Sequence, residues 1–323
     1  MMQYVELPGV DAPVSRVVQG AISLFALDEE TRLEMLDAAV EGGITAFDTA
    51  VNYAFGDISV DAMLGRWISH RGGHEDIAII AKGCHPAPPE WTHPRVNPEA
   101  IVEDIDKSRQ QIGIDRLDLW MFHRDDPTVE IGILVEAVNA AIDRAHIGAW
   151  GVSNWTTARI EAALDYADAH DLRGPVANSA HYSLANQLDD PWPDVVTLTG
   201  PEREADRQWH QDREVDVVAW SPLAGGFLSE RISRAELEAA EGFIADTARC
   251  YFNDDNWARR ERAAEVGRRL GLNLSQVALA WALHADFSPL VIVANATIGE
   301  VEENIAAEGT VLADADLDYI FSG

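Results

Sequence analysis

The sequence of 323 residues predicts an α/β protein: a closed (β/α)8 TIM barrel formed by a single domain. Short apolar runs alternate with amphipathic stretches along the whole chain, which is typical of parallel strands joined by helices. No low-complexity linker or charge block separates a second domain within residues 1–323. The competing architecture, a doubly wound sheet, is disfavoured because no Gly-x-Gly-x-x-Gly turn follows an early strand.

The predicted strands are short runs rich in apolar and β-branched residues. They lie at 16–19, 46–49, 77–81, 117–122, 149–152, 176–178, 215–219 and 290–293. The helices between them carry end signals: Asp28, Asn97 and Thr156 are N-caps, with Pro98 at a first helical position. We also expect helices at 259–270 and 275–284, and a short one at 233–241.

The N-terminal segment 1–14 contains a Pro8-Gly9 turn and predicts a hairpin that closes the bottom of the barrel. Three connections after predicted strands are long, at 84–96, 184–199 and 223–256. Loops at the carboxyl ends of barrel strands build the binding site in this fold. We therefore expect ligand contacts in these connections.

The amino-acid composition limits the cellular environment and the binding partners that we expect for this protein. The 55 acidic residues outnumber 24 Lys and Arg, for a net charge of -31, which disfavours nucleic acid and anionic membranes as partners. We interpret the acidic surface as a halophilic adaptation, the alternative being an ordinary acidic protein. No apolar run reaches membrane-spanning length, the N-terminus lacks a secretory signal, and two isolated cysteines fit a reducing compartment. A cytoplasmic location is expected, and no pattern specifies an oligomeric state.

Four polar residues follow or end three consecutive predicted strands. They are Asp48, Tyr53, Lys82 and His123. In a barrel these positions converge at one mouth, where an acid, a phenol, an amine and an imidazole can transfer protons. We expect the Lys82 ammonium, oriented by Asp48, to lower the pKa of Tyr53. Lysine occurs only at Lys82 and Lys107, so its retention here is notable.

The ordered motifs resemble those of the aldo-keto reductases along nearly the whole chain. The matching segments are Phe47-Asp48-Thr49-Ala50 with Tyr53, Lys82-Gly83, His123, Gly151-Val152-Ser153-Asn154, Tyr182-Ser183-Leu184, Trp220-Ser221-Pro222-Leu223 and Glu302-Glu303-Asn304. The run from His123 to Pro127 is similar to that of bacterial and archaeal members.

This resemblance implies an NAD(P)-dependent oxidoreductase that reduces an aldehyde or ketone to an alcohol, or runs in reverse. Tyr53 would be the general acid or base, and His123 would orient the carbonyl. Lys82, paired with Asp48, would adjust the pKa of Tyr53. The cofactor contacts implied or suggested by position are Ser153, Asn154, Ser179, Trp220, Ser221, Pro222, Leu223, Gly225, Thr297, Glu300, Glu303 and Asn304. Gly225 is equally consistent with a simple loop turn.

The chain departs from the family pattern at three cofactor positions. Trp220 stands where most members have Tyr, and Ser179 where they have Gln. NADP-preferring members carry a cation after the last strand, but the segment 293–300 has none, and Glu300 takes a place where some members have Arg. This predicts relaxed or NAD-leaning specificity, unless an arginine from the connection 223–256 reaches the 2′-phosphate.

Other interpretations remain open. Each site residue alone fits a structural role, and a cofactor-binding regulatory subunit with slow turnover, or a lyase using Lys82 as a Schiff-base amine, are alternative functions. Four aromatic residues, Phe55, Trp91, Trp120 and Trp155, could wall an apolar substrate pocket or fill the core. No cationic clamp for an acidic substrate is evident, and His85 and His93 near Cys84 match no zinc spacing, so no metal is expected.

Overall fold

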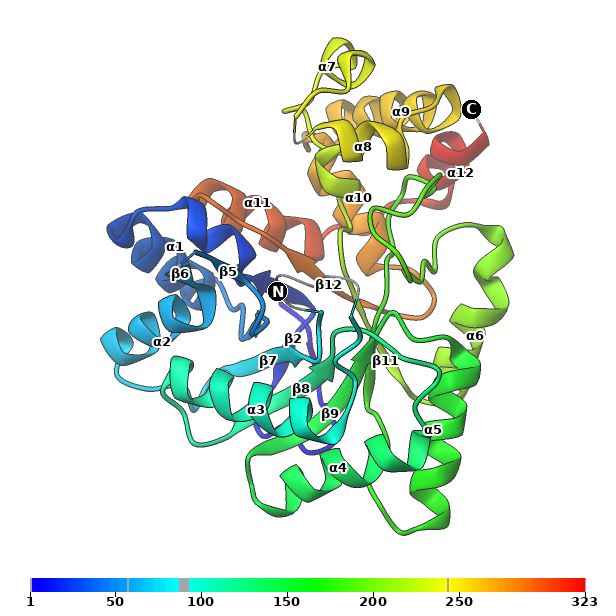
Figure 1. Ribbon diagram of the computed structural model, residues 1–323. Helices are drawn as coiled ribbons and strands as arrows, with labels where there is room; N and C mark the ends of the chain where they lie inside the picture. The colour runs from blue at the N-terminus through cyan, green and yellow to red at the C-terminus, as the bar shows by residue number, and fades with distance from the viewer. Residues whose placement is uncertain (1, 57, 87–92, 243, 323) are drawn as a thin grey trace.

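The computed structural model describes residues 2–56, 58–86, 93–242 and 244–322. Within them, eight parallel strands close into a barrel in chain order, and the last pairs with the first (Figure 1). The strands are β3 (Val17–Gly20), β4 (Ala46–Asp48), β7 (Ala78–Gly83), β8 (Leu117–Phe122), β9 (Ile147–Ser153), β10 (Ala177–Ser179), β11 (Asp216–Ala219) and β12 (Leu290–Val293). The predicted TIM barrel is confirmed, and the bounds of β8 and β12 are those predicted.

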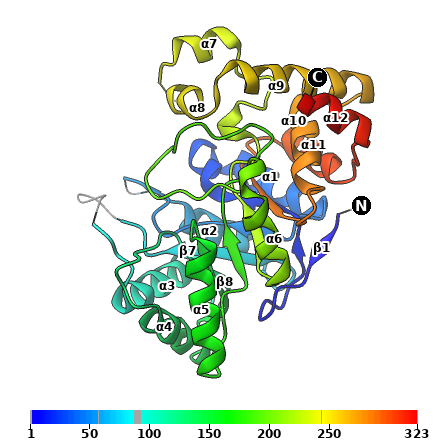
Figure 2. The ribbon, with the colours of Figure 1, turned by 90° about the vertical axis from the view of Figure 1, so that its right-hand side faces the viewer.

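Helices surround the barrel and cover the outer faces of its strands (Figures 1 and 2). They are α1 (Glu29–Glu41), α2 (Val60–Arg71), α3 (Pro98–Ile112), α4 (Ile131–Asp143), α5 (Thr157–Ala169), α6 (Glu204–Asp212), α10 (Leu274–Leu283) and α11 (Ile298–Glu308). The predicted caps are present, since Asp28, Asn97 and Thr156 each accept a hydrogen bond from a backbone N–H of the first turn. The amphipathic patterns thus form a shell of helices around an apolar core.

The bottom of the barrel is covered by an antiparallel pair, β1 (Tyr4–Val5) and β2 (Val14–Ser15). Leu7 and Ala12, between these strands, pack with the side chains that fill the barrel interior. Gly9 has φ of +86°, and a Cβ there would lie 2.6 Å from the Gly148 carbonyl oxygen. The turn therefore requires glycine, both for its left-handed backbone and for its close approach to β9.

Several elements lie outside the regular alternation. They are η1 (Ala21–Ala26), β5 (Ala54–Phe55), β6 (Ile58–Ser59), η2 (Pro201–Arg203), η3 (Ala224–Gly226), α7 (Arg234–Ala239), α8 (Ile244–Tyr251), α9 (Asp254–Leu270) and α12 (Asp314–Ser322). Helices α7, α8, α9 and α12 gather on one side of the barrel (Figures 1 and 2), where they share a second apolar cluster. Most of this group, the helices α7, α8 and α9, belongs to the long connection between β11 and β12.

Two further observations concern the chain as a whole. Cys84 and Cys250 are both buried and both free thiols. Among the described residues, no helix combines the length and apolar character needed to span a lipid bilayer.

Candidate active site

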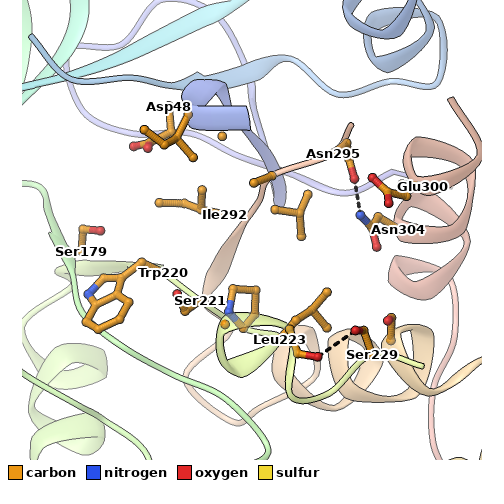
Figure 3. Close-up of a pocket in the computed structure, with 18 of the residues that line it drawn as sticks. Asp48, Ser179, Trp220, Ser221, Leu223, Ser229, Ile292, Asn295, Glu300 and Asn304 are labelled. Atoms are coloured by element: carbon orange, nitrogen blue, oxygen red, sulfur yellow. Dashed lines mark hydrogen bonds between the residues drawn. The ribbon is translucent and has the colours of Figure 1, made fainter. Parts of the chain in front are cut away.

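A cavity of about 870 Å³ opens at the carboxyl ends of the barrel strands. Every residue predicted for catalysis or cofactor binding lines it. Figure 3 shows its extent: Asp48, Ser179 and Trp220 lie at one end, and Asn295, Glu300 and Asn304 at the other. We call these the catalytic end and the nucleotide end. The sequence thus places residues from most of its length around one pocket.

The catalytic end contains a buried ion pair. Lys82 Nζ donates to Asp48 Oδ2, and the two side chains are only 3% and 4% exposed. Lys82 is in β7 and Asp48 ends β4, and these neighbouring strands pair in parallel, so their register brings the groups together. Burial raises the pKa of Asp48, while the Lys82 charge opposes the rise. Because the amine is engaged by a carboxylate, the lyase alternative is disfavoured.

Tyr53 lies beside this pair, with its ring centroid 5.8 Å from Lys82 Nζ. Burial raises the pKa of Tyr53 above its ordinary value, the Asp48 charge adds to the rise, and Arg124 opposes it. The direction is opposite to the lowering expected from the sequence. The physical reason is that the ammonium is largely neutralised by Asp48, so burial dominates.

A second buried carboxylate stabilises the backbone at the catalytic end. Asp61 in α2 is 1% exposed and accepts hydrogen bonds from the hydroxyls of Thr49, at 2.6 Å, and Ser108, at 2.7 Å. Thr49 directly follows Asp48, and its carbonyl oxygen lies 3.5 Å from Lys82 Nζ. These contacts fix the backbone at the end of β4.

His123 follows β8 and faces Tyr53 edge-on, with ring centroids 5.7 Å apart. Its Nδ1 lies 2.9 Å from Asn52 Oδ1. Burial holds the pKa of His123 well below its ordinary value, and the charges of Lys82 and Arg124 add to this effect. The ring is therefore neutral, and the orientation of the Asn52 amide determines which ring nitrogen carries the proton.

The side chains predicted to hold a carboxamide form a connected group beside His123. Ser153 Oγ donates to the Ser179 carbonyl at 3.0 Å, and Asn154 Oδ1 accepts from Trp220 Nε1 at 3.2 Å. Asn154 also has a left-handed backbone, with φ of 60°, which Asn tolerates better than most residues. Ser179 Oγ is buried and has no hydrogen-bond partner among the described residues. An unpartnered buried hydroxyl is costly, so this atom suits a polar ligand group.

The nucleotide end is assembled from α11 and from the connection that precedes α7. Asn304 Nδ2 donates to Asn295 Oδ1, and Asn295 Nδ2 donates to Gln19 Oε1 at 2.7 Å, which ties α11 to β3. Glu300 forms an ion pair with Arg231, whose side chain is 69% exposed. The arginine anticipated from the connection 223–256 is therefore present, but it contacts Glu300. Gly225 lines the cavity with φ of +61° and also makes a loop turn.

Three residues of the site were not predicted from the sequence. Arg124 and Trp192 line the cavity, and Asn52 contacts His123. Arg124 lies within the His-Arg-Asp-Asp-Pro motif, which was a reason to consider it as a site residue. Trp192 lies in the connection after β10 and belongs to no motif.

Of the aromatic residues proposed as a pocket wall, the three that the structure describes do not form one. Trp120 and Trp155 are fully buried core residues, and Phe55 is 43% exposed and stacks on Phe25. Trp91 lies outside the described residues. The aromatic wall consists instead of Trp192 and Trp220, with ring centroids 5.1 Å apart. Among the residues that the structure describes, no group of three or more His, Cys, Asp or Glu side chains is arranged to hold a metal ion.

The fold is a (β/α)8 barrel with a group of polar residues at the carboxyl ends of its strands. The chain belongs to the aldo/keto reductase family, whose sequence model matches residues 16–322. Similar proteins include two named probable voltage-gated potassium channel subunit beta, one from Arabidopsis thaliana and one from Oryza sativa subsp. japonica. Each is 24% identical over 314 residues, covering 95% of this chain and 91% of the relative.

Proposed function

We propose that this protein is a cytoplasmic oxidoreductase that reduces a small aldehyde or ketone with hydride from a nicotinamide cofactor, or oxidises the alcohol in reverse. The observation that carries the proposal is the gathering of four side chains at one end of a long cavity, where Asp48, Lys82 and His123 are buried and Tyr53 is partly buried. The same cavity continues past Trp220 to Asn304, which suits an extended dinucleotide. Membership of the aldo/keto reductase family supports this reaction class.

The chain's residues suit the cofactor. Trp220 offers an aromatic face, and the unpartnered Ser179 Oγ offers a hydrogen bond to a carboxamide. A bound reduced nicotinamide supplies the hydride. Tyr53 gives its phenolic proton to the carbonyl oxygen, and His123 holds that oxygen in place. Lys82 offsets the Asp48 charge, so that Tyr53 does not lie beside an unpaired buried carboxylate.

For the nucleotide, the proposal is NAD-leaning or relaxed specificity. Glu300 is suited to ribose hydroxyls and repels a 2′-phosphate. Arg231 partly offsets that repulsion, since it is mostly exposed and can leave Glu300 for a phosphate. The balance between these two side chains sets the preference.

A second candidate function is a cofactor-binding regulatory subunit with slow turnover. It is favoured by the two relatives named above, each of which is a probable voltage-gated potassium channel subunit beta. The complete set of Asp48, Tyr53, Lys82 and His123 favours turnover instead.

A titration of the purified protein with NADH and with NADPH in molar salt tests both candidates, using wild type and Tyr53→Phe. The reductase proposal expects similar nucleotide binding by both proteins and aldehyde-dependent oxidation by wild type alone. Tight binding without turnover of any carbonyl favours the regulatory subunit. Folded protein that binds neither nucleotide overturns both.

A further inference from the structure

Arg124 is the cation of the catalytic end that is available to a substrate. It lines the cavity together with Tyr53 and His123. Lys82 also lies there, but its charge is paired with Asp48. His85 lies 4.9 Å from the His123 ring, and burial lowers its pKa, so it is neutral. No cation for an acidic substrate was predicted from the sequence, and Arg124 takes that role at the catalytic end.

The guanidinium of Arg124 has no carboxylate partner within the described part of the chain. Its Nη1 donates to the His123 carbonyl oxygen at 2.9 Å, and its Cζ lies 5.6 Å from the Trp192 ring centroid. The adjacent Asp125 is engaged by Arg159, with 3.3 Å between Oδ1 and Nε. Asp194 contributes a favourable field to Arg124 but lies beyond ion-pair distance.

Other partly buried arginines also lack a carboxylate partner, but Arg16, Arg32 and Arg207 each donate to two backbone carbonyls, whereas Arg124 donates to one. The chain carries a net charge of -31, and many of its arginines form ion pairs with Asp or Glu. A partly buried cation gains most from an anion that brings a planar pair of oxygens, because two parallel hydrogen bonds then form. The acidic surface also repels anionic ligands, so an acidic substrate needs a local cation to be held.

The surroundings of Arg124 specify the rest of the ligand. Trp192 and Trp220 form an aromatic wall, with their planes tilted by 32°, and Arg124 lies over Trp192. An anionic group at Arg124 therefore lies beside an apolar surface and close to Tyr53 and His123.

We propose that Arg124 forms an anion subsite, and that the substrates are aldehydes or ketones with an apolar or aromatic body and a carboxylate or similar anionic group. This inference rests on the proposed reductase function. It differs from the expectation of an apolar substrate pocket without a cationic clamp.

Matched substrate pairs at constant ionic strength test the subsite. The 2-, 3- and 4-carboxybenzaldehydes are compared with their methyl esters, using wild type, Arg124→Gln, Arg124→Lys and Arg144→Gln. Arg144 is exposed and lies outside the cavity, so its variant controls for the loss of one positive charge. We expect wild type to prefer at least one acid over its ester. Arg124→Gln should lower kcat/KM for that acid about 30-fold more than for its ester, mainly through KM. Arg124→Lys should recover part of the loss, and Arg144→Gln should change neither substrate.

Two outcomes overturn the subsite while leaving the reductase proposal intact. Either wild type prefers every ester to the corresponding acid, or Arg124→Gln lowers kcat/KM equally for acid and ester. If wild type reduces no aldehyde at all, the reductase proposal fails, and calorimetry with benzoate and benzamide decides the subsite separately. Selective weakening of benzoate binding by Arg124→Gln supports an anion site, and equal binding of the two compounds overturns it.

Discussion

The two ends of the cavity are built on different physical principles. At the catalytic end, Asp48 and Lys82 come from neighbouring strands and are almost completely buried. At the nucleotide end, Glu300 and Arg231 come from a helix and a long connection, and Arg231 is largely exposed. Charges interact strongly when they are buried and weakly when water and salt screen them. The chemical step therefore depends on a few rigid, buried groups. The choice of nucleotide depends on a balance of weak, screened charge interactions.

The largest expected effect concerns the buried pair. Lys82→Met should lower turnover by about 10³-fold and reduce the free energy of unfolding by about 3 to 5 kcal/mol, because Asp48 is left buried without a partner. Steady-state kinetics and denaturant unfolding measure the two effects.

The double variant Asp48→Asn/Lys82→Met is the matched control. It should regain most of the lost stability and part of the turnover, since no unpaired buried carboxylate then lies beside Tyr53. Near-normal activity in Lys82→Met would show that the catalytic end is no more dependent on single residues than the nucleotide end.

A second test concerns the His123 tautomer. The structure places Asn52 Oδ1 toward His123 Nδ1, and His123 can donate to a carbonyl oxygen through Nε2 only when the amide is turned so that its NH2 group faces Nδ1 instead. Asn52→Asp removes this arrangement, because a carboxylate only accepts and keeps the proton on Nδ1. We expect kcat/KM to fall by about 100-fold with nucleotide affinity unchanged.

The tautomer in both proteins is read from the ¹⁵N shifts of His123. Wild-type activity in Asn52→Asp, with the proton on Nδ1, would exclude His123 as a donor to the substrate.

The catalytic end was predictable because its residues are tied to strand ends. Asp48, Lys82 and His123 follow short apolar runs, and parallel strands in a barrel bring such positions together whatever the helices between them. The register of a strand is fixed by its buried residues, so a short motif locates a side chain in space.

Residues on long connections could not be placed in the same way. Arg231 and Trp192 take their positions from packing between distant segments, which no local pattern encodes.

The pKa of Tyr53 was predicted in the wrong direction for a related reason. A sequence shows which charges are near but not how deeply they are buried, and burial is the larger influence here.

The raised pKa of Tyr53 gives a pH test of the same point. A raised pKa keeps the phenol protonated, so reduction, which needs the phenol, should be constant from about pH 6 to pH 9. Oxidation needs the phenolate and should rise about tenfold per unit of pH across that range. Rates in both directions with saturating nucleotide measure this. A fall in the reduction rate above about pH 8 would mean that bound substrates lower the pKa of Tyr53. The Lys82 charge would then outweigh the effect of burial.

The smallest expected effect is at the nucleotide end. Glu300→Gln removes a carboxylate near the expected phosphate position and frees Arg231, so NADPH should bind about tenfold more tightly while NADH changes little. Arg231→Gln should weaken NADPH alone, and in the double variant the gain from Glu300→Gln should largely disappear because the cation is gone. Both effects should shrink in molar salt, unlike the loss in Lys82→Met, since the Arg231 side chain is exposed to screening. If Glu300→Gln changes both nucleotides equally at every salt concentration, Glu300 does not discriminate between them, and nucleotide choice must depend on other residues.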